Sequence, residues 1–235
     1  MINILILASG RHKDKEPPTC IQEYKGKTIL QYIKEQSLEG IDANYTFAFL
    51  ENDMKQYHLD SIAKVLAPEA DIVALQSNTG GSACTALYAA CKLQQDTPLL
   101  IISTNEIVDI CYADVLSSFE NDADGGIMTF SSVHPRYSYI KLLNSSIVEV
   151  CQQKPLSNYA TTGSFWFRKT SFFVNAAKKS IFNNCVTSNQ FYIAPVYNQM
   201  LLDGMKIHHY DVEGHYIPFK ADMPSDFSRI EAKEV

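Results

Sequence analysis

Two short runs of this chain are almost entirely apolar, and they constrain its fold more than any other feature. They are residues 2–8 (INILILA) and residues 98–103 (PLLIIS). A strand with one face in water alternates apolar and polar residues, whereas a strand covered on both faces does not. Strands of the second kind are typical of parallel sheets with helices on either side. The two runs therefore predict the buried centre of an α/β domain.

The rest of the chain alternates between strand patterns and helix patterns. We expect further strands at 45–50, 71–75, 126–131 and 207–211, and helices at 28–37, 54–66, 82–93, 114–120, 170–182 and 191–203. This order predicts a Rossmann-like, three-layer α/β/α fold with a mixed, mainly parallel sheet. No internal repeat or low-complexity linker divides the chain. Residues 1–235 are therefore expected to form a single domain.

The bulk composition argues against several classes of protein. The chain is 46% hydrophobic and 20% charged, as soluble globular proteins are. Its net charge of -6 argues against a nucleic-acid partner, since such proteins usually carry a basic surplus. No run approaches the roughly 18 apolar residues of a membrane helix, so no membrane insertion is expected. The first apolar run meets charged residues at once and does not resemble a signal peptide. Six cysteines without a C-x-x-C pair then indicate reduced thiols in a cytoplasmic protein.

Three polar loops are predicted to begin where strands end. The first starts at Ser9, the second spans residues 76–81 and the third spans residues 104–109. In open α/β sheets, ligands bind beyond the carboxyl ends of the strands. Loops that leave apolar strands and carry glycine with polar residues suit a nucleotide, so these three loops are the predicted ligand site.

The stretch from Gly125 to Phe167 is the most informative for function. A strand-like run is followed by an extended SYIKL, a turn, IVEV, a lone Lys154-Pro155 and a small-residue TTG that leads into an aromatic strand. This order resembles the acceptor half of the sugar nucleotidyltransferases, including those of capsule and lipopolysaccharide synthesis. The resemblance covers nearly the whole chain and implies that Lys154 meets the acceptor phosphate. It also implies acceptor binding by Thr161, Thr162, Gly163 and Tyr192, the last within NQFYIAPVYN, which is similar to the family's NGEFYVAPVYN.

The first loop, ILASGRHKDKEPP, resembles the family's phosphate loop ILAAGxGxR. The resemblance implies nucleotide binding by Ala8, Ser9 and Gly10, and neutralisation of the triphosphate by Arg11. The sequence departs from the family at His12, where a second glycine is expected, and at Asp14, where an arginine is expected. Thr19 stands in place of a phosphate-binding lysine. A solvated, charged loop is the alternative interpretation.

The second loop resembles the stretch that holds the nucleobase in the family. Glycine permits close approach of a backbone, and glutamine offers both a donor and an acceptor to a base edge. The loop also opens a helix, whose N-terminal amides favour an anion. The residues implied in nucleotide binding here and in the third loop are Gln76, Asn78, Gly80, Gly81 and Thr104. A glycine-rich start of a helix, without a ligand, is the alternative.

Magnesium is the cofactor that the resemblance implies, although one of its ligands is altered. Asn105 stands where the family has a metal-binding aspartate, and Mg²⁺ prefers carboxylate oxygen to a neutral amide. Asn105 itself is a candidate ligand, and Glu106 or Asp109 could take over, although strand alternation lets at most one of these two acids face the site. Asp222, in ADMPSDF, matches a second metal ligand of the family. The cap of a helix that begins at Pro224 is the alternative for Asp222.

Two other patterns are weaker candidates for a metal site. Asp122-Ala123-Asp124 has the D-x-D form of a glycosyltransferase metal site, but it precedes a strand and is interpreted as a solvated turn. His208 and His209 alternate along a predicted strand, so they are expected to face opposite ways and not to bind a metal together.

The leading hypothesis is transfer of a nucleotidyl group from an NTP to a sugar phosphate or similar phosphorylated small molecule, with release of pyrophosphate. Asp14, Thr19, Asn105 and Gln190 replace charged or otherwise characteristic family residues, so a catalytically impaired nucleotide- or sugar-phosphate-binding protein is the first alternative. A glycosyltransferase is the second. The sequence determines neither the base, nor the acceptor, nor the oligomeric state.

Overall fold

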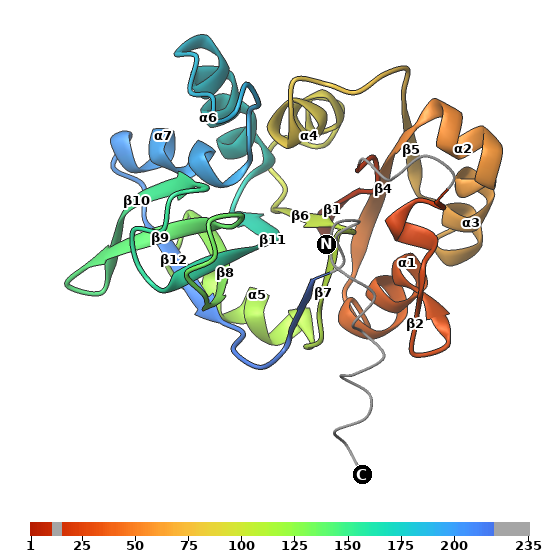
Figure 1. The fold of residues 1–235 in the computed structure, drawn as a ribbon, viewed down its shortest axis with the longest axis horizontal. Helices are drawn as coiled ribbons and strands as arrows, with labels where there is room; N and C mark the ends of the chain where they lie inside the picture. Colours follow the sequence, from red (N-terminus) through yellow and green to blue (C-terminus); the bar gives the residue numbers. More distant parts are fainter. Residues whose placement is uncertain (11–15, 219–235) are drawn as a thin grey trace.

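A computed structural model describes residues 1–10 and 16–218. Its centre is one half of a nine-stranded sheet, in which β1 (Ile2–Leu7) lies between β4 (Ala43–Leu50) and β6 (Leu99–Ser103). The strand β5 (Asp71–Leu75) continues the sheet beyond β4, and all four strands run parallel (Figure 1). The two apolar runs therefore form neighbouring central strands, as predicted.

The other half of the sheet is antiparallel and is organised around β11 (Tyr159–Phe167). This strand pairs with β6 along Ser164–Phe167 and with β8 (Gly125–Ser131) along its length, with a shift in register between Thr161 and Phe165. Its first part also pairs with β9 (Ser138–Leu143), which is followed at the edge by β10 (Ser146–Gln152). The last long strand, β12 (Ile207–Asp211), pairs parallel with β8.

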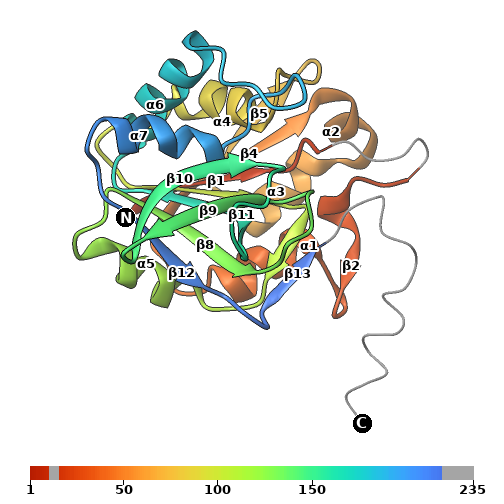
Figure 2. The same ribbon diagram turned by 60° about the vertical axis from the view of Figure 1, so that its left-hand side comes forward.

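The central strands are buried on both faces, which explains their unbroken apolar sequence. Ile4 and Ile6 of β1 pack in one hydrophobic core, and Leu5 and Leu7 pack in the other. The helices of the first core are α1 (Ile29–Tyr32), α2 (Glu51–Tyr57), α3 (Leu59–Leu66) and α5 (Tyr112–Glu120). Those of the second are α4 (Ser82–Ala90), α6 (Thr170–Phe182) and α7 (Tyr197–Leu202), which lie above the sheet in Figure 2. The predicted three-layer α/β fold is confirmed.

Short elements complete the described chain. β7 (Glu106–Val108) pairs antiparallel with β13 (Tyr216–Pro218), and β2 (Glu23–Tyr24) forms a hairpin with β3 (Lys27–Thr28). Two 3₁₀ turns span Thr19–Ile21 and Ala194–Val196. No helix within residues 1–10 and 16–218 is long and apolar enough to cross a membrane.

Three predicted helices differ from the structure. The helix expected at 54–66 is two helices, because His58 takes a left-handed conformation (φ 52°) and ends α2. The helix expected at 28–37 begins under a cap by the Thr28 hydroxyl, which accepts from the amide of Gln31 at 3.1 Å, but becomes a π-helix from Ile33 to Ser37. The helix expected at 191–203 is helical only from Ala194.

Candidate functional site

A cavity of about 310 Å³ opens at the carboxyl ends of the parallel strands. The last residue of each strand lines it: Leu7 of β1, Leu50 of β4, Leu75 of β5 and Ser103 of β6. This is the end of an open α/β sheet at which ligands bind. Its volume is at the lower end of the range of small-molecule sites.

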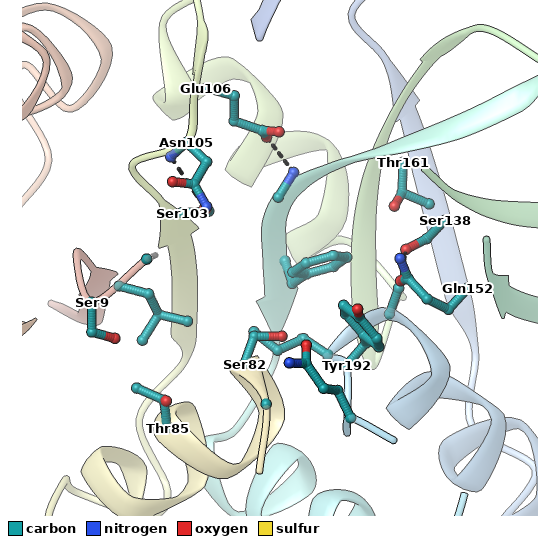
Figure 3. Close-up of a pocket in the computed structure, with 18 of the residues that line it drawn as sticks. Ser9, Ser82, Thr85, Ser103, Asn105, Glu106, Ser138, Gln152, Thr161 and Tyr192 are labelled. Carbon is teal, nitrogen blue, oxygen red and sulfur yellow. Dashed lines mark hydrogen bonds between the residues drawn. The ribbon is translucent and has the colours of Figure 1, made fainter. Parts of the chain in front are cut away.

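The antiparallel half of the sheet supplies the opposite wall of the cavity. In Figure 3, Ser138, Gln152 and Thr161 lie across the cavity from Ser9, with Tyr192 and Ser82 below. Ser138 donates a hydrogen bond to the amide oxygen of Gln152, which joins β9 to β10 at this wall. The cavity therefore has one wall of parallel strand ends and one of antiparallel strands.

Gly10 brings the first loop against the third. A Cβ atom added to Gly10 would lie 2.8 Å from the amide oxygen of Asn105, closer than real Cβ contacts. The backbone amide of Asn105 donates to the Ser103 hydroxyl at 3.3 Å, which fixes the start of the third loop. The glycine thus accommodates the Asn105 side chain, and both residues line the cavity.

Glu106 is a buried carboxylate on the cavity wall, with 8% of its surface exposed. It accepts hydrogen bonds from the backbone amide of Gly163 and, at 3.0 Å, from the hydroxyl of Tyr216. A Cβ atom at Gly163 would lie 2.8 Å from Ser103 and 3.1 Å from the Glu106 carboxylate, so a larger residue would displace this contact. Burial, together with the Glu106 charge, raises the pKa of Tyr216 well above its usual range, so Tyr216 stays protonated and remains a donor.

Asp109 lies away from the cavity, as strand alternation from Glu106 predicts. Its carboxylate accepts from the Tyr32 hydroxyl at 2.5 Å and pairs with Lys25 at 3.1 Å. Burial acts to raise the pKa of Asp109, but the hydrogen bonds from Tyr32 and Lys25, together with the charge of Lys25, lower it. Of these two acids, only Glu106 lines the cavity.

The glycines of the second loop contact protein backbone. The Phe191 amide donates to the Gly80 carbonyl at 2.9 Å, and the Phe191 carbonyl accepts from the Ala83 amide at 3.0 Å. A Cβ atom at Gly81 would lie 2.3 Å from that carbonyl. These bonds tie the backbone of Phe191 to the second loop and to the start of α4, and the helix predicted from 191 begins only at Ala194. They also occupy one of the first amides of α4, that of Ala83, which is therefore not free to bind an anion.

The structure brings most of the predicted site residues together. Those that line the cavity are Ser9, Gly10, Asn78, Gly81, Asn105, Glu106, Thr161, Thr162, Gly163 and Tyr192. Five others do not line it. Ala8 and Thr104 are buried in backbone contacts, Gly80 packs against Phe191, and Gln76 and Lys154 are exposed. Arg11 and Asp222 lie outside the described residues.

Several residues that line the cavity were not predicted from the sequence. Ser82, Thr85, Arg136, Ser138, Gln152 and Tyr216 line the cavity without having been predicted. Arg136 could have been predicted as a site residue, because it lies within the stretch 125–167 that resembles an acceptor site and arginine is rare in this chain. Nothing in the sequence pointed to Tyr216, because β13 reaches the cavity only by pairing with β7.

The described residues do not form a magnesium site by themselves. No group of three or more histidine, cysteine or acidic side chains in the described part of the chain is placed to hold a metal ion. Asn105 offers a neutral amide, and both oxygens of Glu106 accept hydrogen bonds. Outside the described residues, Asp222 is the predicted candidate for a further Mg²⁺ ligand.

The two weaker metal patterns lie elsewhere. Asp122 pairs with Lys206 at 3.3 Å and lies 3.5 Å from His208, and all three are on the surface. His209 faces the other way and contacts the Thr129 hydroxyl at 3.0 Å. Burial lowers the pKa of His209. The two histidines therefore point to opposite sides of β12, as predicted.

Solved structures share this fold over nearly the whole chain. A nucleoside-diphosphate-sugar pyrophosphorylase from Vibrio cholerae superposes with a TM-score of 0.78 at 15% identity, covering 97% of this chain and 100% of its own. A candidate glucose-1-phosphate thymidylyltransferase from Bacillus anthracis gives 0.75 at 16% identity, covering 99% and 94%. The inositol-1-phosphate CTP transferase from T. maritima gives 0.68 at 15% identity, covering 99% and 96%. No protein-family model and no curated protein matches the sequence. The chain therefore has the fold of known sugar nucleotidyltransferases, at an identity too low to carry their substrates across.

Proposed function

We propose that this protein is a nucleotidyltransferase that moves a nucleotidyl group from an NTP to a sugar phosphate or similar phosphorylated acceptor. The observation that supports it best is the cavity. The ends of four parallel strands and the predicted acceptor strand β11 line one volume, although they come from both halves of the chain. The fold shared with sugar nucleotidyltransferases points to the same reaction class.

The proposed reaction is a displacement at phosphorus. An oxygen of the acceptor phosphate attacks the α-phosphorus of the NTP and forms a new P–O bond. The bond from the α-phosphorus to the oxygen that bridges it to the β-phosphate breaks, and pyrophosphate leaves with that oxygen. Such a step needs in-line positioning and neutralisation of charge more than covalent help from the protein.

We assign one substrate to each wall of the cavity. Ser9, Gly10, Asn78 and Gly81 line the parallel wall, which we assign to the nucleotide. The antiparallel wall, with Thr161, Thr162, Gly163 and Tyr192, is assigned to the acceptor. Arg11 is proposed to neutralise the triphosphate, and Lys154 to approach the acceptor phosphate from the surface. Synthesis of surface-polysaccharide precursors is the cellular role that the resemblance favours.

A non-catalytic binding protein on the same fold is the second candidate. The neutral amide of Asn105, where the family has a metal-binding aspartate, favours it. The two candidates share the cavity and the nucleotide loops. They differ in whether a bound NTP loses pyrophosphate.

Titration calorimetry with CTP, UTP, dTTP, ATP and GTP, each with and without Mg²⁺, tests the proposal first. Binding of one nucleotide that tightens with Mg²⁺ is expected, followed by release of pyrophosphate when glucose 1-phosphate or inositol 1-phosphate is added. Pyrophosphate release from one of these pairs would exclude the binding protein. Failure of all five nucleotides to bind at millimolar concentration would reject the nucleotidyltransferase and leave a repurposed scaffold, such as a sugar-phosphate-binding protein, as the better account.

A further inference from the structure

Arg136 is the one arginine or lysine among the described residues that line the cavity. It lies in the connection between β8 and β9, two residues before Ser138. The one carboxylate among the described residues that line the cavity is Glu106, which is already hydrogen bonded to Gly163 and Tyr216. A positive charge on an otherwise nearly neutral wall selects for an anionic group on the ligand.

The guanidinium of Arg136 is held in place before any ligand binds. It lies 4.6 Å from the ring centroid of Tyr137 and donates from Nη2 to the Tyr137 hydroxyl. Tyr137 in turn packs edge-on against Phe130 and Tyr216, with ring centroids 4.9 and 5.8 Å apart. A cation fixed on an aromatic face loses little entropy on binding, which favours planar, bidentate recognition of an oxyanion.

One donor of Arg136 is left without a partner. Its Nε atom is buried and makes no hydrogen bond among the described residues. A buried donor of a charged group costs free energy when it is unpaired, and such an atom beside a cavity marks the place of a missing acceptor. A ligand oxyanion would supply that acceptor.

The position of Arg136 assigns this anion to the acceptor side. Ser138, Gln152 and Thr161 lie together on the wall opposite Ser9 (Figure 3). Lys154, the residue that the sequence resemblance favours for the acceptor phosphate, is exposed and does not line the cavity. The preformed cation on this wall is therefore Arg136 and not Lys154.

We propose that Arg136 binds an oxyanion of the acceptor, either its phosphate or a sugar carboxylate. This inference rests on the proposed function, because that function makes the antiparallel wall the acceptor site. It makes Arg136 a specificity-determining residue that rejects uncharged sugars. Loss of a hydrogen bond to a charged group corresponds to a weakening of roughly tenfold to a hundredfold.

The Nε–H group of Arg136 gives a direct test by NMR. The chain has four arginines, at positions 11, 136, 168 and 229, so arginine-labelled protein gives few Nε signals. Arg168 is an internal control, since its Nε already donates to the Ala123 carbonyl at 2.6 Å. Titration with inorganic phosphate, glucose 1-phosphate and glucuronate is expected to shift the Arg136 signal saturably and to leave that of Arg168 in place. A shift with inorganic phosphate or glucose 1-phosphate but not with glucuronate assigns the phosphate, whereas a shift with glucuronate alone assigns a carboxylate. Glucose is the uncharged control.

Two variants complete the test. Arg136→Gln is expected to weaken binding of the probe that shifts the signal by about tenfold or more, with unchanged NTP binding. Lys154→Gln is expected to weaken binding of a phosphate probe less than Arg136→Gln does, and the Arg136 signal should still shift, because Lys154 is exposed and does not line the cavity. The inference is overturned if none of the three anions moves the Arg136 signal, or if Lys154→Gln abolishes anion binding and Arg136→Gln does not. In either case NTP binding by the wild-type chain would leave the proposed function standing. An anion response without any NTP binding would instead retain the anion site and reject the proposed function.

Discussion

Replacement of Gly81 by alanine perturbs the contact that joins the second loop to residue 191. Gly81 has φ +134°, which residues with a side chain rarely adopt, and the new Cβ would lie 2.3 Å from the Phe191 carbonyl oxygen. Backbone strain of this kind costs about 1–3 kcal/mol. Relief of the clash must also move Phe191 away from Gly80 and Ala83, which loses two hydrogen bonds worth about 0.5–1.5 kcal/mol each. The expected loss of stability is therefore about 2–6 kcal/mol.

Gly204→Ala is the matched control for this variant. Gly204 also has a positive φ, +76°, but no atom lies within 4 Å of the position of its Cβ. Gly204→Ala therefore introduces backbone strain without a steric clash, and its free energy of unfolding is expected to fall by about 1 kcal/mol. The difference between the two variants isolates the contact with Phe191.

Thermal unfolding followed by the fluorescence of Trp166 is the assay. Trp166 is the single tryptophan of the chain and is 1% exposed, so unfolding changes its surroundings completely. A chain of this size loses roughly 2–4 °C in Tm per kcal/mol, so Gly81→Ala should lower Tm by about 5–20 °C and Gly204→Ala by only a few degrees. Equal losses in the two variants would refute the role assigned to the contact between Gly81 and Phe191.

Three further predictions follow from single contacts. In Gly10→Ala, the new Cβ atom would contact only the end of the Asn105 side chain, which can rotate away. The free energy of unfolding should therefore fall by less than about 1 kcal/mol, whereas calorimetry should show weaker NTP binding. Glu106→Leu leaves the Gly163 amide and the Tyr216 hydroxyl without their acceptor, and urea unfolding should show a loss of about 1–3 kcal/mol for each. Glu106→Gln should lose less than half as much, because its amide oxygen still accepts a hydrogen bond. Burial lowers the pKa of His209, so its stabilising effect is present above the ordinary value of 6.5 and is lost as the pH falls below it. His209→Gln should therefore lose less stability than the wild type between neutral and mildly acidic pH, and an equal loss in both would assign the effect to other groups.

The strands were predictable because their pattern is local. Burial on both faces favours apolar residues along a whole central strand. Residues 2–8 and 98–103 could therefore be predicted as such strands without knowledge of their neighbours. The break at His58 was not predictable in this way. The surrounding residues keep a helical spacing of apolar positions, and only the backbone geometry shows that one residue leaves the helix.

The sequence by itself determined the α/β class, the order of most strands and the loops that reach the cavity, since these depend on periodicity and on the carboxyl ends of strands. Tertiary structure decided what each site residue contacts. Three glycines of the site were predicted to let a ligand approach, but each accommodates a distant protein group instead. Gly10 lies against Asn105, 95 residues away along the chain, and Gly81 lies against Phe191, 110 residues away. Gly163 lies against Glu106, 57 residues away. Arg136 became a candidate only when β9 and β10 brought its surroundings into the wall. Contacts over such separations depend on how the sheet closes around the cavity, and no local pattern records them.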